Sequence, residues 1–457
     1  MDDVRTRLAS IVGDGNFLAG AEIPEDYGRD EDLTGRPQLP AYVAKPGSAK
    51  EVAELLTTAA EHGVPVTARG SGTGISGAAR PVAGGLVVSF ERMNAVLEID
   101  TGNHVAVVQP GVTVAELDAR AAEHGLTYPV RPGELSGSLG GNVATNAGGM
   151  RAVKYGVTRD NVLGLEAALP TGEVIRTGGK VAKSSSGYDL TQLIIGSEGT
   201  LALVTEVIVK LRPRLPHGAT VLAPFGDFGQ VMAAVPEIVA SGVGPHILEY
   251  IDAATMAAIV DREGLDLGVP AEIRAACDAY LVVALESRDD RRLAEDVETT
   301  GELLSGLGAT EVYVLDGGAA RRLIEAREKA FWVVKAVGCD DTIDAVVPRT
   351  EMPRFIAAAQ ELARAAGGDA LGCGHAGDGN VHLAIRCPDP AIRKKLFTEI
   401  LAYAVELGGQ ISGEHGLGRA KTGYFTELAD PARIALMRRI KHAFDPTGIL
   451  NPGVLFP

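Results

Sequence analysis

Two histidines lie on a predicted β-hairpin, where the chain reads DALGCGHAGDGNVHLAIR from Asp369 to Arg386. Gly377–Asn380 is predicted to form the turn between two strands, which places His375 directly opposite His382. Directly opposed residues of an antiparallel pair share one face of the sheet, with Cβ atoms about 4.5–5.5 Å apart. Two imidazoles in this arrangement can hold one divalent metal ion.

The same face of the hairpin also carries a thiol. Cys373 lies two residues from His375 along the strand and is a further candidate ligand. The alternative interpretation is a half-buried hairpin whose histidines hold no metal. The hairpin alone does not decide between the two interpretations.

A short motif further along the chain, Gly413-Glu-His-Gly416, favours the metal interpretation. Glu414 can supply the carboxylate of a site with two histidines and one carboxylate, which leaves positions open for water or substrate. His415 can serve as a base near pH 7. Taken alone, the motif is equally well explained as an exposed loop that follows a helix.

Two glycine-dense stretches could bring backbone N–H groups close to a ligand. They are RGSGTGISG at Arg69–Gly77 and RPGELSGSLGGNVATNAGGMR at Arg131–Arg151. Glycine permits close approach and positive φ, and small hydroxyls and amides add neutral donors for phosphates or for the polar edge of a flavin. A flexible linker is the alternative for the second stretch, but its apolar residues oppose that interpretation.

The first stretch matches GxGxxG through Gly72, Gly74 and Gly77, yet we reject a doubly wound dinucleotide fold. That fingerprint requires a helix at the last glycines and an acidic residue about 20 positions later. Here Pro81 and two glycines follow, and the run 86–89 reads as a strand. We therefore expect a free-standing pyrophosphate cradle of backbone N–H groups; a tight hairpin is the alternative.

Composition narrows the class of protein. The 457 residues are too many for one core, and 46% hydrophobic with 22% charged residues is ordinary for a globular protein. A net charge of −16 argues against a nucleic-acid partner.

The four cysteines form no CxxC pair, so no iron–sulfur module is expected, and a reducing cytoplasm is predicted. The first residues do not resemble a secretory signal, and no apolar run is long enough for a transmembrane span, although peripheral membrane contact stays open.

The elements that must position these residues can be predicted in outline. Residues 1–45 are turn-rich with few periodic signals, and Ser48 with Glu51, like Thr113 with Glu116, has capping-box spacing. In the first half, strands are predicted at 64–68, 86–89, 95–99, 104–109, 161–169, 173–176 and 201–211. Beyond 218, strands are predicted at 219–223, 246–251, 279–286, 310–315 and 342–347, and helices at 227–240, 290–307, 317–337, 350–366, 389–407 and 430–447. This alternation predicts a compact α+β domain.

Taken together, nine motifs in order resemble a known family, the FAD-dependent D-2-hydroxy acid dehydrogenases of the vanillyl-alcohol-oxidase type. The chain is similar to D-lactate dehydrogenases, D-2-hydroxyglutarate dehydrogenases and the flavin subunit of glycolate oxidase, from about residue 25 to 457. The motifs are Arg69–Gly77, Pro132–Gly133, Gly140–Gly149, Tyr155–Gly156, Gly187–Leu190, Gly196–Thr200, Gly374–His382, Ser412–Gly416 and Asn451–Gly453.

The resemblance implies an α+β fold with a two-subdomain PCMH-type FAD-binding domain and an α+β cap domain that contains an antiparallel sheet. The expected boundaries are 1–215 for the FAD-binding domain, 216–415 for the substrate and metal domain, and 416–457 for a segment that returns to the flavin. Cofactor contacts are expected from Arg69, Gly70, Ser71, Gly72, Thr73, Gly74, Gly77, Pro132, Gly133, Ser136, Ser138, Gly140, Gly141, Asn142, Asn146, Gly149, Glu198, Val204 and Asn451.

The resemblance also implies a catalytic set. His375, His382 and Glu414 match metal ligands, with zinc the expected metal, and His415 matches a catalytic base. Arg327 would clamp the substrate carboxylate, and Asn380 would lie beside the substrate. The metal would lower the pKa of the substrate hydroxyl, and hydride would pass from C2 to flavin N5.

The sequence departs from some relatives in ways that matter. Relatives that tether their flavin use a histidine or cysteine in the first glycine loop, and Arg69–Gly77 has neither, so non-covalent FAD is expected. In relatives that handle hydroxy diacids, a threonine follows the arginine and a lysine precedes the next strand. Phe331 and Thr342 stand at these places, which favours a monocarboxylate, including one with an apolar side chain.

The sequence does not decide the substrate, the electron acceptor or the oligomeric state. The substrate would be a small 2-hydroxy acid, and the electron acceptor a quinone, a cytochrome or a partner protein; a homodimer is one arrangement that fits. Two other interpretations are a non-redox FAD enzyme of the alkylglycerone-phosphate synthase type and a flavin subunit that is inactive alone.

Overall fold

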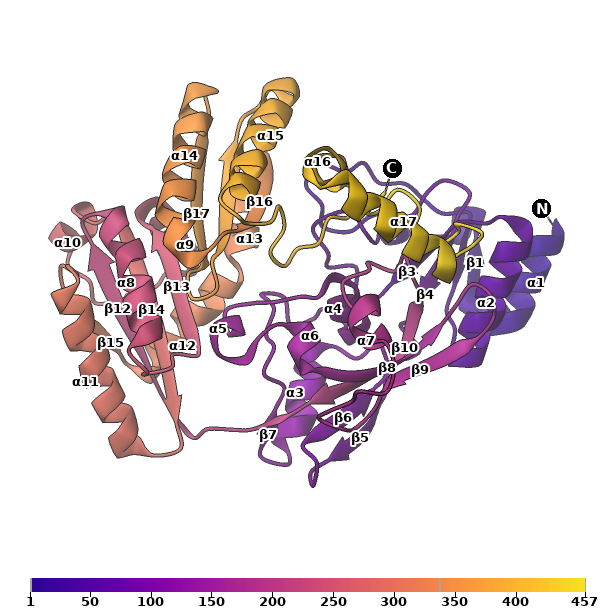
Figure 1. Ribbon diagram of the computed structural model, residues 1–457, viewed down its shortest axis with the longest axis horizontal. Coiled ribbons are helices and arrows are strands. Elements are labelled where there is room, and N and C mark those ends of the chain that lie inside the picture. The colour runs from indigo at the N-terminus through magenta and orange to yellow at the C-terminus, as the bar shows by residue number, and fades with distance from the viewer. Residues whose placement is uncertain (1, 337, 457) are drawn as a thin grey trace.

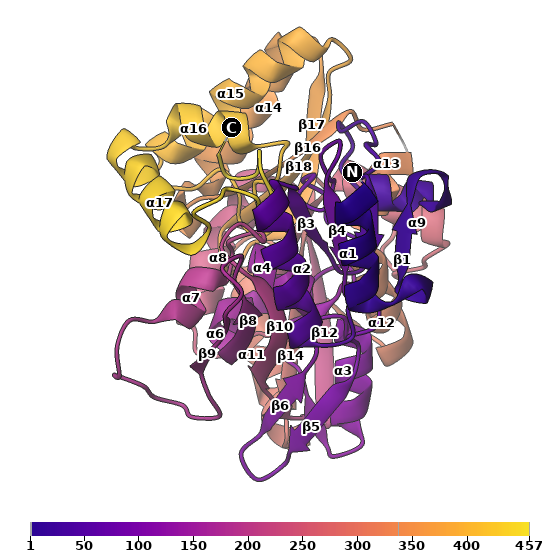
Figure 2. The same cartoon turned by 90° about the vertical axis from the view of Figure 1, so that its right-hand side faces the viewer.

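The computed structural model describes residues 2–336 and 338–456, and the chain forms two halves that lie side by side (Figure 1). The N-terminal half contains two main sheets, and the next part is built on one large sheet. The last segment, with α16 (Thr422–Leu428) and α17 (Pro431–Phe444), returns to the N-terminal half (Figure 2). There Leu450 forms a parallel bridge with Val66, and the Lys441 ammonium donates to the Thr200 carbonyl over 2.8 Å.

The first sheet has four strands, in the order β1 (Phe17–Ala19), β2 (Tyr42–Ala44), β4 (Leu86–Ser89) and β3 (Val66–Arg69). Strands β2, β4 and β3 are parallel, and α2 (Ala49–His62) and α1 (Asp2–Val12) pack together beside them. The Ser48 hydroxyl accepts a hydrogen bond from the Glu51 backbone N–H (3.2 Å), and α2 ends at Gly63 with φ +63°. No helix follows Arg69–Gly77; the next element is β4, as we expected when rejecting the dinucleotide fingerprint.

The second sheet has five antiparallel strands, in the order β5 (Val96–Asp100), β6 (Val105–Val108), β10 (Leu203–Lys210), β8 (Val162–Ala168) and β9 (Val174–Gly178). Helix α3 (Val114–Ala122) begins with a complete capping box between Thr113 and Glu116. The middle of the second glycine stretch forms a short helix, α4 (Leu139–Thr145), which packs its buried Leu139 and Val143 on the core of this sheet.

The large sheet has seven antiparallel strands, in the order β15 (Tyr313–Leu315), β12 (His217–Phe225), β14 (Ala279–Ser287), β13 (Ile247–Asp252), β17 (Asp369–His375), β18 (Asn380–Arg386) and β16 (Asp341–Val346). One face packs on α8 (Phe228–Ala240), α11 (Asp290–Gly306), α14 (Met352–Ala365) and α15 (Pro390–Glu406). The opposite face packs on α9 (Ala253–Glu263), α12 (Gly317–Glu328) and α13 (Ala330–Ala336).

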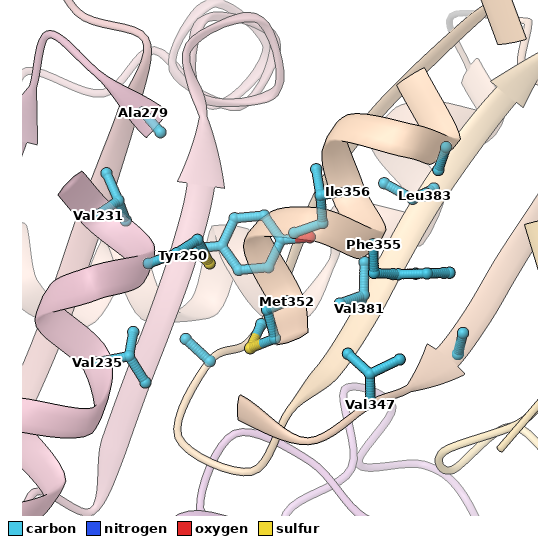
Figure 3. Close-up of a cluster of buried hydrophobic side chains, with 14 of the residues drawn as sticks. Val231, Val235, Tyr250, Ala279, Val347, Met352, Phe355, Ile356, Val381 and Leu383 are labelled. Atoms are coloured by element: carbon cyan, nitrogen blue, oxygen red, sulfur yellow. The ribbon is translucent and has the colours of Figure 1, made fainter. Parts of the chain in front are cut away.

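Alternation along the strands decides which side chains enter each layer. Leu248 and Tyr250 of β13 point into the first core, where Tyr250 reaches towards Ile356 of α14 (Figure 3). Val381 and Leu383 of β18 lie in the same core. In each of these two strands, the residue between the two named residues therefore faces the opposite side of the sheet, which carries α9, α12 and α13. The reason is that successive side chains of a strand point to opposite faces.

The predicted α+β class is confirmed, and most predicted elements of the second half have observed counterparts within a few residues. Helix α1 was not predicted within residues 1–45, and it buries Leu8 and Val12; the rest of this stretch is mostly short turns and irregular chain, as its composition indicated. The single helix predicted at 317–337 is two helices, α12 and α13, separated at Lys329; residue 337 lies outside the described residues. Helix α9 was not predicted. None of the described helices is long and apolar enough to cross a membrane.

The segment that follows Glu414 and His415 packs directly on the first glycine loop. The Ser76 hydroxyl donates to the His415 carbonyl (3.0 Å), and the Ala420 N–H donates to the Ser76 carbonyl (3.1 Å). Gly418 has φ +50°, and a Cβ there would collide with the Ser76 carbonyl oxygen.

We therefore expect Gly418→Ala to destabilise the protein by roughly 2 kcal/mol or more, because strain in the left-handed region adds to the collision. Gly423→Ala is the matched control, since Gly423 lies in α16 and a Cβ there would meet nothing within 4 Å. Urea unfolding of both variants measures the difference. Equal midpoints would show that this contact does not constrain the loop.

Candidate active site

The hairpin that carries the two histidines has a different register from the predicted one. Strand β17 ends at His375 and β18 begins at Asn380, so the turn is 376–379 rather than 377–380. Cys373 is opposite His382, and His375 is opposite Asn380, so the predicted pairing of the two histidines was wrong. The reason is that Gly379, at φ +87°, completes the turn, and its N–H donates to the His375 carbonyl (3.1 Å).

The observed register still leaves both imidazoles on one face of the sheet. The observed partner of His375 is two residues away from the predicted one, and residues two apart in a strand share a face. Their ring centroids are 4.9 Å apart. Glu414 reaches both rings: its Oε1 lies 3.1 Å from His375 Nε2 and 3.3 Å from His382 Nε2. The predicted metal-binding residues therefore converge.

A second group, Asp344, His382 and His415, is equally compact in the described part of the chain. The Asp344 carboxylate is already saturated, however. One oxygen accepts the Ser412 hydroxyl (2.7 Å) and three consecutive backbone N–H groups at 413–415 (2.9–3.1 Å), and the other accepts Asn380 Nδ2 (2.8 Å). The group with His375, His382 and Glu414 is the better metal site, because the Glu414 carboxylate contacts mainly the histidines.

Charges around Asp344 fix its ionisation. Burial would raise the pKa of Asp344, but the charges of His415 and Lys421 hold it well below its usual range. For His415 burial has a larger effect than the neighbouring charges, and it lowers the pKa of the imidazole to about 4. His415 is therefore neutral at pH 7 and can accept a proton.

A second buried carboxylate, Glu249 on β13, contacts two of the predicted site residues. Its Oε1 lies 2.6 Å from His375 Nδ1, and its Oε2 forms an ion pair with the Arg327 guanidinium at 2.7 Å. Burial alone would lower the pKa of His375, but the carboxylates of Glu249 and Glu414 raise it well above its usual value. The cluster therefore favours a positive charge at the position between the rings.

A cavity of about 300 Å³ is lined by both halves of the chain, and the two histidines of the hairpin, Glu414, His415 and Arg327 are part of its wall. Predicted site residues that line it are Gly70, Ser71, Gly72, Thr73, Gly74, Pro132, Gly133, Ser138, Gly141, Asn142, Glu198, Arg327, His375, His382, Glu414, His415 and Asn451. A smaller cavity of about 60 Å³ adds Gly140 and Val204. Residues that the sequence placed in separate motifs thus surround one continuous space.

Six predicted site residues do not line either cavity. The Arg69 guanidinium donates to the Arg29 carbonyl (2.6 Å), and the Ser136 carbonyl accepts the Ser71 hydroxyl (2.6 Å). Asn146 ends α4 at φ +54°, and Asn380 donates to Asp344 and to the Ala345 carbonyl. The other two, which pack on neighbouring chain, are Gly77 and Gly149. Direct cofactor or substrate contact by these six stays a prediction.

The cavity wall suits a flavin dinucleotide. The loop Arg69–Gly77 contributes mostly backbone, and Gly70 approaches the Ser138 side chain too closely to carry a Cβ. The Asn142 amide Nδ2 is buried with no hydrogen-bond partner among the described residues, which is unusual unless a ligand accepts from it. A cradle of main-chain N–H groups with neutral side-chain donors fits phosphates and the flavin edge.

Comparison with known proteins decides the family. Residues 40–178 match the family model described as FAD binding domain, and residues 214–455 match the model described as FAD linked oxidases, C-terminal domain. The chain belongs to the FAD-linked oxidases. The predicted family of FAD-dependent enzymes is therefore confirmed.

Several relatives of this FAD-linked oxidase align over most of its length. It is 68% identical over 456 residues to a Mycobacterium tuberculosis protein described as an uncharacterized FAD-linked oxidoreductase, covering 100% of the chain and 99% of the relative. It is 38% identical to glycolate oxidase subunit GlcD of Bacillus subtilis (99% and 97% covered). It is 36% identical to D-lactate dehydrogenase of Anaerostipes hadrus (95% and 94% covered).

The fold also matches solved structures. p-Cresol methylhydroxylase superposes with a TM-score of 0.83 at 17% identity, covering 99% of this chain and 96% of that one. This likeness, with the matched FAD-binding domain, confirms the predicted PCMH-type fold.

Sequence reasoning missed Asp344 and Glu249, the two carboxylates that hold the site together. Each is an acidic residue inside an otherwise apolar strand, in DTIDAV and ILEYID. Such an exception to the apolar pattern predicts a buried charge with a partner, and this signal could have identified both residues.

Proposed function

We propose that this FAD-linked oxidase oxidises a D-2-hydroxy monocarboxylic acid to the 2-keto acid, for which FAD, when bound, would supply the hydride acceptor. The observation that carries the proposal is that Arg327, His415 and the compact group His375, His382 and Glu414 line the same cavity. D-Lactate, glycolate and more apolar analogues are the substrates considered, in keeping with the names of its relatives.

A divalent metal, which we infer to be zinc, would bind to His375, His382 and Glu414. Two imidazole nitrogens and one carboxylate oxygen form a donor set that suits zinc and leaves positions open for substrate oxygens. When bound, the metal would supply Lewis acidity that lowers the pKa of the substrate hydroxyl. FAD would bind non-covalently along Arg69–Gly77 and 132–149, since the first loop has no histidine or cysteine.

His415 is proposed to take the hydroxyl proton. Its imidazole is neutral at pH 7, since burial lowers its pKa to about 4, and the N–H donated to Asp344 fixes the loop that carries it. Asn380 would act through Asp344, because its Nδ2 donates to that carboxylate. We therefore assign Asn380 a positioning role in place of the substrate contact expected from the sequence.

The lining of the cavity supports a substrate with one carboxylate. Arg327 is the one lysine or arginine among the described residues that line the larger cavity. The wall is largely apolar and includes Phe331, Leu371 and Ala384, with Thr342 as a neutral polar group. A second carboxylate on the substrate would find no cation there, whereas an apolar side chain would be accommodated.

Anaerobic mixing of the purified holoenzyme with hydroxy acids tests the function. We expect D-lactate, glycolate or D-2-hydroxyisocaproate to bleach the flavin, L-lactate to be inactive, and D-2-hydroxyglutarate to be slower than the best monocarboxylate. Bleaching by none of these acids would contradict the proposal and favour a non-redox FAD enzyme. Turnover with an artificial dye then separates a self-sufficient enzyme from a flavin subunit that needs its partner.

We expect His415→Ala to retain FAD and metal but to reduce flavin roughly 10²–10⁴-fold more slowly, because the proton acceptor is lost. Stopped-flow measurement of flavin reduction gives the rate. His442→Ala, at an exposed histidine on α17, is the matched control and should reduce flavin normally. Reduction by the His415 variant at the wild-type rate would remove His415 from the chemistry.

We expect chelation, or His375→Ala, to abolish metal binding and turnover together. Metal analysis of the purified proteins, with dye-linked activity on the same samples, measures both. Cys373→Ala should leave the metal content nearly unchanged, since Cys373 is not in either compact ligand group of the described residues. Full activity in exhaustively chelated enzyme would rule out the metal.

A further inference from the structure

The Glu249 carboxylate joins two parts of the site that come from different elements. It lies on β13 directly opposite His375 of β17, and its side chain is 0% exposed. One oxygen is 2.6 Å from His375 Nδ1, and the other is 2.7 Å from the Arg327 guanidinium on α12. A single buried anion thus contacts both a proposed metal ligand and the proposed carboxylate clamp.

We propose that Glu249 is a positioning residue that sets the metal-binding tautomer of His375 and the orientation of Arg327 at the same time. The proposal rests on the function proposed above for its effect on substrate, but its effect on metal binding does not depend on any substrate. Glu249 would touch neither the reacting atoms nor the metal.

The first effect follows from the two contacts of the His375 ring. A buried carboxylate 2.6 Å from Nδ1 requires that this nitrogen carry the proton and donate it. Nε2 faces the Glu414 carboxylate at 3.1 Å, and a metal bound there would replace the proton between them, so that the lone pair of the then neutral ring would be on Nε2. A carboxylate on the far nitrogen also raises the basicity of the ligand nitrogen and fixes the plane of the ring.

The second effect concerns the direction of Arg327. Its side chain is only 7% exposed, so the charge is stable there because Glu249 neutralises it. The Arg327 Nη2 contacts Glu249 as an ion pair without hydrogen-bond geometry, and Nε has no hydrogen-bond partner among the described residues, which leaves guanidinium N–H capacity for a substrate carboxylate. Glu249 therefore holds one edge of the guanidinium while another edge stays available to the cavity.

Glutamine cannot replace Glu249 in both contacts. It has nearly the same shape, but one of its terminal atoms is an amide nitrogen that can only donate. If that nitrogen faces Arg327, two donors oppose each other. If it faces His375, the imidazole must move its proton to Nε2 and can no longer bind metal through that atom.

The test compares wild-type holoenzyme with Glu249→Gln. We expect the variant to keep its FAD and to bind Zn²⁺ roughly 10–100-fold more weakly in a competition with a fluorescent chelator. With zinc at saturation, we expect the KM for D-lactate to stay raised about tenfold, because the Arg327 contact is not restored by metal. Zinc affinity within twofold of wild type, or a KM that zinc fully restores, would overturn the double role.

Asp252→Asn is the matched control on the same strand. Asp252 is also a buried carboxylate, but it accepts from the Thr255 and Gly372 backbone N–H groups and contacts neither His375 nor Arg327. We expect this variant to change stability without changing zinc affinity or KM. An equal loss of zinc affinity in both variants would show a general effect of buried carboxylates and would overturn the proposal.

A measurement on the wild-type protein covers the case in which Glu249→Gln does not fold. In protein labelled with ¹⁵N-histidine and loaded with Zn²⁺, the His375 ring should show a protonated Nδ1 and a metal-bound Nε2. The opposite tautomer would overturn the proposal. If no hydroxy acid reduces the flavin while the zinc results hold, the proposed function fails and the Glu249–His375 contact stands.

Discussion

The Asp344 carboxylate holds the loop that carries Glu414 and His415 in its place beside the hairpin. A buried carboxylate must be neutralised by hydrogen bonds and charges, because an unpaired charge in the interior is strongly unfavourable. Here three consecutive backbone N–H groups at 413–415 and the Ser412 hydroxyl supply the donors. Asp344 is also the β16 residue paired with His382 of β18. The loop and the hairpin are therefore positioned by the same strand. Separating their side chains would remove the hydrogen bonds of the Asp344 carboxylate and leave its charge unpaired in the interior.

The same loop is held from the other side by the N-terminal half. Glu198 accepts hydrogen bonds from the Leu417 N–H (2.5 Å) and the Gly418 N–H (2.7 Å), and Ser76 donates to the carbonyls of His415 and Gly416. Burial raises the pKa of Glu198 to about 7, although the two N–H donors act against the rise. Residues 412–418 thus bridge the glycine loops, where a flavin would lie, and the large sheet, where the histidines stand. The relative position of cofactor and reacting atoms would depend on this one short segment.

Local signals in the sequence predicted the parts of the structure that depend on neighbouring residues. Thr113 and Glu116 form the predicted capping box, and β4 follows the first glycine loop as its residues indicated. The hairpin was predicted but its register was not, because the turn depends on a residue distant in the sequence: the N–H of Val347, just after β16, donates to the Gly379 carbonyl (3.1 Å). Glu249 and Asp344 were missed for a similar reason: their partners are far apart in sequence, and only the strand order β13-β17-β18-β16 brings them together. Convergence of His375, His382 and Glu414 was expected from the hairpin and the motif Gly413–Gly416 as well as from the family resemblance, whereas the contacts made by the two missed carboxylates required the fold.

The charges that the fold buries around the site constrain what it can bind. Glu249, Asp344 and Glu414 carry three negative charges, which Arg327, Lys421 and the protonated His375 balance in the metal-free protein. A metal bound by His375 would displace the proton of that ring. A divalent cation would change this balance to one positive charge, and a monoanionic substrate would then neutralise it. A dianion would leave an uncompensated negative charge beside this buried cluster, which is unfavourable at low dielectric. Asp378, whose pKa burial raises to about 7, can only add negative charge and so increases the disadvantage of a dianion. The proposed preference for one carboxylate is thus supported by the charge balance of the whole cluster as well as by the lining that includes Arg327.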